Sequence, residues 1–98
     1  MVTKDKISVK QLCIHYDIPI SFVKALSEFE LVEILTIQEI QYISITQIRT
    51  IEKLIHWHYE LDINMEGMDV VYNLLKQIES LQDEIITLDN RLKFYEGE

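Results

Sequence analysis

Residues Leu74 to Tyr95 read LLKQIES LQDEIIT LDNRLKF Y, which is three heptads and the first residue of a fourth. Large apolar residues recur in steps of four and three, and the residues between them are mostly polar. At 1.5 Å per residue, a helix over this stretch is roughly 33 Å long, more than the core of a small domain needs. We therefore expect a coiled coil that joins two copies of the chain through Leu74, Ile78, Leu81, Ile85, Leu88, Leu92 and Tyr95.

The orientation of this coiled coil depends on the charges beside its apolar seam. A parallel pair in register sets Glu84 of one chain near Asp89 of the other, which is a like-charge contact. An antiparallel pair instead brings Glu84 towards Arg91. The charges therefore favour an antiparallel homodimer, although each exposed pair contributes little energy.

Length and composition restrict the class of protein. The 98 residues form one small domain, and the 48% hydrophobic content with 2 Gly and 1 Pro predicts a folded, helix-rich chain. The net charge of -8 disfavours nucleic acid as a partner and favours a basic protein surface. The single Cys13 excludes an internal disulfide and suits a reducing compartment. Because no leader-like or membrane-spanning apolar run is present, we expect a cytoplasmic protein without a membrane segment.

Two short helices and a tight turn are predicted before the coiled coil. Ser8 is placed to cap the first helix, whose apolar face includes Val9, Leu12 and Cys13. Asp17 and Pro19 end it, and the second helix follows at once. Its apolar face folds back on the first helix through Ile18, Phe22, Val23 and Leu26. This arrangement is typical of a helix-turn-helix.

A β-hairpin and a third helix are predicted next. Residues 31–45 are rich in β-branched and aromatic side chains, which favours two strands joined by a turn at Thr36 to Gln38. Thr46 is expected to cap the third helix, with Trp57 in its core in preference to an exposed contact. The apolar stripe of this helix is expected to consist of Ile48, Ile51, Ile55, His58 and Tyr59.

The last helix is expected to begin at Asn64, whose side chain suits an N-cap. Gly67 lies in its first turns, where glycine costs about 1 kcal/mol relative to alanine. We expect this glycine to permit the close approach of another helix.

The predicted fold is mainly α with a small β-hairpin: a helix-turn-helix and wing over residues 1–46, a third helix over 47–63, and a long dimerisation helix over 64–96. This order resembles the winged helix-turn-helix of MerR-type transcription regulators. The junction LDINMEGMDVV, residues 61–71, and the following repeat LQDEI, residues 81–85, are similar to chaperone modulators of the CbpM type.

The chain departs from DNA-binding relatives where those proteins contact DNA. A MerR-type reading helix usually has an Arg-Tyr-Tyr-like run, but this chain has Val23 to Leu26 there, with Lys24 as the helix's only basic residue. The wing has Glu33, Glu39 and Gln41 where such regulators place arginines. From residue 1 to residue 46 there are four lysines against six acids. Few phosphate contacts are possible on such a surface, so DNA binding is not expected.

Enzymatic and metal-binding patterns are absent from the sequence, which predicts a protein without catalytic residues, cofactor or metal. His56 and His58 point about 200° apart on a helix and so cannot share one metal ion. His58 is expected to be a hydrogen-bonded core residue. The pairs His56 with Glu60 and Cys13 with His15 each lack a third ligand.

Resemblance to the chaperone modulators implies a partner, the J-domain of a DnaJ-like co-chaperone, for which the chain competes with Hsp70. From charge and expected exposure, the candidate contacts are Lys24, Glu28, Glu30, Glu33, Glu39 and Tyr42. The usual role of such an acidic run is a solvated face. Two alternatives are a MerR-type regulator that reads DNA as a dimer and a coiled-coil adaptor whose N-terminal half only caps the rod.

Overall fold

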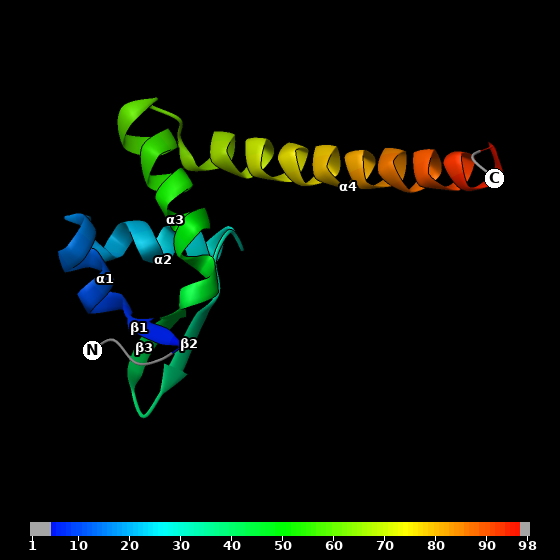
Figure 1. The fold of residues 1–98 in the computed structure, drawn as a ribbon. Coiled ribbons are helices and arrows are strands. Elements are labelled where there is room, and N and C mark those ends of the chain that lie inside the picture. Colours follow the sequence, from blue (N-terminus) through cyan, green and yellow to red (C-terminus); the bar gives the residue numbers. More distant parts are fainter. Residues whose placement is uncertain (1–4, 97–98) are drawn as a thin grey trace.

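The computed structural model describes residues 5–96 as a small helical body from which one long helix projects (Figure 1). The predicted class, mainly helical with a small sheet and a long C-terminal helix, is confirmed. In chain order the elements are β1 (Lys6–Ser8), α1 (Val9–Tyr16), α2 (Ile20–Glu28), β2 (Ile34–Ile37), β3 (Ile40–Ser44), the 3-10 helix η1 (Ile45–Gln47), α3 (Ile48–Ile55), the π-helical turn η2 (His56–Glu60) and α4 (Met65–Glu96).

Helices α1 and α2 form the predicted helix-turn-helix. The Ser8 side chain accepts a hydrogen bond of 3.1 Å from the backbone N–H of Gln11, which confirms it as the cap of α1. Asp17 ends α1 in the left-handed conformation, with φ of 56°. The predicted apolar faces meet in the core, where Leu12, Val23 and Leu26 are fully buried.

The sheet has three antiparallel strands in the order β1-β3-β2, so the prediction of two strands missed β1. The predicted turn at Thr36 to Gln38 is also wrong, because Thr36 pairs with Gln41 and Ile37 pairs with Ile40. The two turn residues are Gln38 and Glu39, both at positive φ (50° and 66°). This is the backbone of a type I′ hairpin turn without the usual Asn or Gly.

The register of the hairpin decides which side chains reach the core. Ile34 and Ile43 are paired and lie on the core side, with Ile43 fully buried. Ile37 and Ile40 pair at the end of the hairpin and are 44% and 49% exposed. The wing therefore presents apolar residues to solvent.

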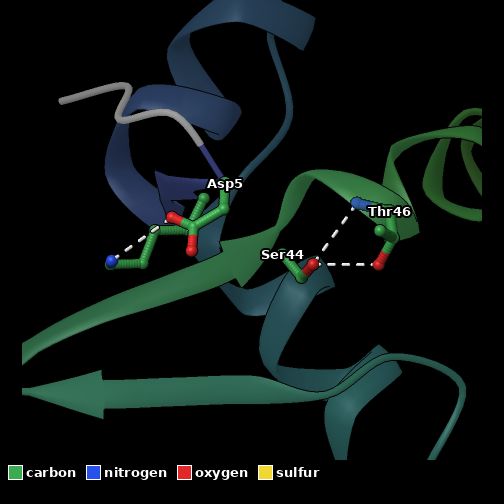
Figure 2. Close-up of polar contacts among 4 residues, drawn as sticks. Asp5, Ser44 and Thr46 are labelled. Atoms are coloured by element: carbon green, nitrogen blue, oxygen red, sulfur yellow. Dashed lines mark hydrogen bonds and ion pairs between the residues drawn. The ribbon is translucent and has the colours of Figure 1, made fainter.

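The third helix begins differently from the prediction. Thr46 does not cap it, because α3 begins after Gln47 without a side-chain cap. Ser44 instead caps the preceding 3-10 helix η1: the Ser44 hydroxyl accepts from the Thr46 backbone N–H and also bonds to its hydroxyl (Figure 2). Leu54, absent from the predicted stripe, is fully buried beside Ile51, whereas the predicted Tyr59 is 48% exposed. Tyr59 belongs to the π turn η2, and its ring still packs against Phe22 with 5.2 Å between the ring centroids.

Two other predictions for this region agree with the structure. The His58 ring nitrogen Nδ1 lies 2.9 Å from the Ile63 carbonyl oxygen, and the ring packs against Phe22. Trp57 is partly buried and packs against the core.

Helix α4 begins as predicted, because Asn64 Oδ1 accepts a 2.7 Å hydrogen bond from the Gly67 N–H. The reason given for Gly67 is wrong, since among residues 5–96 no other helix approaches it closely. A Cβ there would lie 2.9 Å from the Ile63 side chain and 3.0 Å from Asn64 Oδ1. Glycine therefore leaves room for the cap of its own helix.

Candidate functional site

The six predicted contact residues lie on α2, on the segment after it and on the wing, which we call the α2–wing face. Tyr42 is half-buried, and the five charged residues are exposed: Lys24, Glu28, Glu30, Glu33 and Glu39. The structure does not gather them into one pocket. It distributes them in pairs over three neighbouring grooves that share lining residues.

The largest of these is the α1–wing groove, with a volume of about 730 Å³. It lies between the starts of α1 and α2 and the end of the hairpin, and Glu39 and Tyr42 line it. The sequence analysis did not single out Ile20 and Ile40, which also line it and are 43% and 49% exposed. Exposed apolar residues are common, so only their position on the fold identifies these two.

The second groove separates α2 from the hairpin and is lined by Lys24 and Glu28 together with Thr36 and Gln41 of the wing. Thr36 and Gln41 also line the α1–wing groove, so the two are continuous across the hairpin. The only basic residue of α2 therefore lies in the same groove as Glu28.

The third groove contains Glu30 and Glu33 and extends to the base of α4, where Tyr72 and Lys76 line it. Gln47 fixes its wall: its side chain accepts from the Glu33 N–H at 2.8 Å and donates to the Glu33 carbonyl at 2.9 Å. Nothing in the local sequence marked Gln47 as this clamp, because its partner is 14 residues away.

Two of the acids occupy backbone positions that favour glycine. Glu30 follows α2 at φ 60°, with Glu30 N–H bonded to the Ser27 carbonyl and Leu31 N–H to the Leu26 carbonyl. This is a Schellman motif, and glycine is the usual residue at the position of Glu30. Glu39 has φ 66° in the hairpin turn. A non-glycine residue in this conformation costs about 1 kcal/mol, so both carboxylates are placed on the surface against the backbone preference.

The charge of the face is acidic. Between Ile20 and Ser44 there are four glutamates and one lysine. A helix-turn-helix reads DNA with the first residues of its second helix, and here that end consists of Pro19, Ile20 and Ser21. These residues offer no cationic group to a phosphate.

The second candidate surface is the apolar seam of α4. In the single chain all seven predicted seam residues are exposed, from 49% for Ile78 to 77% for Tyr95. Figure 1 shows that most of α4 extends away from the body, so the body does not cover them. Exposed apolar surfaces of this kind are a feature of interaction sites, so the seam is a candidate for one.

Burial raises the pKa of several titratable side chains. One of them is the Cys13 thiol, which lies in the core. Burial, and then the 2.8 Å hydrogen bond to Glu52, raise the pKa of Tyr16. His56 bonds to Glu60, but within residues 5–96 no group of three or more His, Cys, Asp or Glu side chains is placed to hold a metal ion. No helix in the described part of the chain is long and apolar enough to span a membrane.

Comparison with known proteins gives one match. The profile of the MerR HTH family regulatory proteins matches residues 7–90, from β1 to the last heptads of α4. No curated protein and no solved structure matches the chain. The matched segment contains the helix-turn-helix, the wing, α3 and most of α4, and the chain therefore belongs to the MerR HTH family of regulatory proteins.

Proposed function

We propose that this chain is a non-enzymatic chaperone modulator that binds the J-domain of a DnaJ-like co-chaperone and competes there with Hsp70. The observation that carries the proposal is the acidic α2–wing face, on a scaffold whose relatives regulate through a helix-turn-helix. The resemblance of residues 61–71 to CbpM-type modulators supports the same partner.

Electrostatics and apolar contact have separate roles in this mechanism. The exposed glutamates attract a basic helical surface over a distance of about one Debye length, roughly 8 Å at physiological salt, and so accelerate the encounter. Apolar contacts within the grooves slow dissociation. The left-handed positions of Glu30 and Glu39 support a functional role, because glycine at either position relieves backbone strain.

The chain acts in this proposal as an antiparallel homodimer through the seam of α4. The seven seam residues bury their exposed surface against a second copy: Leu74, Ile78, Leu81, Ile85, Leu88, Leu92 and Tyr95. Since α4 leaves the body at its first turns, an antiparallel pair places the two bodies at opposite ends of the rod. Each dimer then presents two α2–wing faces.

The first test is charge reversal on this face. We expect Glu30→Lys with Glu33→Lys to weaken binding to the J-domain about tenfold at low salt, mainly through a slower association rate. The measurement is a titration by calorimetry, with association rates measured at two salt concentrations. Unchanged affinity would remove these two acids from the interface.

The matched control reverses Glu79 and Asp83, which lie on α4 outside the seam. Both double variants change the net charge from -8 to -4, because each replacement by lysine removes one negative charge and adds one positive charge. The control should bind as the unmodified chain does. If both variants weaken binding equally, total charge and not the face is responsible.

A third variant, Glu30→Gly, separates backbone strain from binding. It should raise the midpoint of unfolding, because glycine relieves the left-handed conformation of residue 30, and it should weaken binding, because it removes a carboxylate from the face.

The second candidate function is DNA binding, because a helix-turn-helix is an architecture that can read DNA. A DNA-binding regulator should be retained on heparin at physiological salt and should bind duplex DNA with a steep salt dependence. The proposed modulator should do neither and should bind one J-domain from the same genome. Salt-sensitive DNA binding without J-domain binding would establish the regulator and refute the modulator.

A further inference from the structure

We propose that the α1–wing groove holds apolar side chains of the partner helix, and that Ile20 and Ile40 are its anchor residues. This inference rests on the proposed J-domain function and names the part of the face that sets residence time. It identifies residues that the charge pattern alone does not indicate.

The composition of the groove carries the argument. Val9, Ile20, Ile40 and Tyr42 form its apolar lining, and Lys10 and Glu39 are its charged residues. Ile20 is the first residue of α2 and Ile40 is the first residue of β3, so two different elements hold the exposed isoleucines in fixed positions. Both isoleucines still expose nearly half of their surface, so a partner that covers them stabilises the complex by at least as much as an exposed ion pair does.

The place of the groove on the fold argues against DNA as its occupant. In a helix-turn-helix the start of the second helix contacts base edges, which present hydrogen-bond donors and acceptors. Ile20 at that place offers neither. Exposed isoleucines beside a carboxylate instead suit an amphipathic protein helix with apolar residues in the groove and a basic residue towards Glu39.

The charges also predict how that helix lies. Glu39 belongs to the hairpin turn and Lys10 belongs to α1, so the groove has an acidic residue from the wing and a basic residue from the first helix. A partner helix with a lysine or arginine on one flank and a carboxylate on the other satisfies both. If the partner helix lies in the opposite direction, its basic residue meets Lys10 and its carboxylate meets Glu39. These like-charge contacts select one direction of binding.

The test replaces each anchor separately in the full chain, as Ile20→Ser and Ile40→Ser, with the J-domain that binds the unmodified chain as the probe. Each should raise Kd about tenfold or more, mainly through faster dissociation, as expected for an interface hot spot. Ile14→Ser is the matched control, because Ile14 on α1 is 66% exposed and lies outside the groove. The control should stay within about twofold of the unmodified chain, as expected of a residue outside the hot spot.

The outcomes separate this inference from the function on which it rests. If the unmodified chain binds a J-domain and both anchor variants bind equally well, the groove proposal is wrong and the function stands. If no J-domain binds the unmodified chain, both are wrong. Circular dichroism of both variants checks that weaker binding does not come from loss of fold. The two anchors also belong to different elements, so a local disturbance of one element does not explain weaker binding by both variants.

Discussion

Replacing Leu81 and Leu88 by aspartate should convert the dimer proposed above into a monomer. Both side chains lie in the middle of the seam and are exposed in the single chain, at 56% and 62%. The proposed dimer buries four such leucines, two from each copy. Because each is already partly covered in the single chain and full burial is worth about 1.5 to 3 kcal/mol per side chain, the four together contribute roughly 3 to 7 kcal/mol. A carboxylate in the same position cannot be buried without a partner, so the loss is larger still.

The measurement is the molar mass in solution by light scattering across a range of protein concentrations. The matched control is Ser80→Asp with Asn90→Asp, which adds the same two negative charges to α4 outside the seam. We expect the control to remain dimeric. If the Leu81 and Leu88 variant also remains dimeric, a surface other than the seam joins the two copies.

Cysteine cross-linking tests the proposed antiparallel orientation. In a Cys13→Ser background the introduced cysteine is the only one in the chain. A parallel pair places Leu81 opposite Leu81 of the partner, so Leu81→Cys alone would form a covalent dimer. An antiparallel pair with Glu84 near Arg91 places Leu81 opposite Leu92. We therefore expect a covalent dimer only when Leu81→Cys and Leu92→Cys chains are mixed, and efficient cross-linking of Leu81→Cys alone would refute the antiparallel pair.

The features that the sequence predicts correctly are those that depend on neighbours along the chain. Ser8 and Asn64 cap their helices through hydrogen bonds to residues three positions later, so the local sequence contains both partners. The long helix α4 follows from the heptad pattern of its residues, whereas the pairing of its apolar seam with a second copy stays a prediction. Within such segments, residue type and spacing determine the structure.

The features that the sequence analysis missed depend on distant residues or on unusual backbone. The three residues of β1 are a strand only because they pair with β3, where Ile7 lies opposite Ile43. Gln38 and Glu39 form a turn at positive φ without a residue type that indicates it. A period of 3.6 residues does not describe the π turn η2, where Tyr59 packs against Phe22 and is still 48% exposed.

The candidate site shows the same division. Charge and composition indicated Glu28, Glu30, Glu33 and Glu39 as exposed acids, and each is exposed. Sequence spacing does not show that Glu39 shares a groove with Ile20, because that contact depends on how the hairpin lies against the start of α2. The apolar half of the site therefore became visible only in three dimensions.

Among the single substitutions described, Leu54→Ala should cause the largest loss in the free energy of unfolding. Leu54 lies outside the apolar stripe that the sequence predicts for the third helix. Leu54 belongs to α3 and is fully buried in the core cluster. With Trp57 and Tyr72 it also lines a cleft between the end of α3 and the first turns of α4. Truncating it leaves a cavity that rigid neighbours on both helices cannot fill. The expected loss in free energy of unfolding is about 2 to 5 kcal/mol, a large part of the total for a small domain.

Leu61→Ala is the matched control for Leu54→Ala, because it removes the same atoms from a side chain that is 55% exposed. It should change the free energy of unfolding by less than about 0.5 kcal/mol. Denaturation by urea, followed by circular dichroism, measures both variants at one protein concentration, because the proposed dimer formation would make the midpoint depend on concentration. Equal midpoints for the two variants would mean that α3 and α4 repack around the missing side chain, and that the junction from which the long helix projects is deformable.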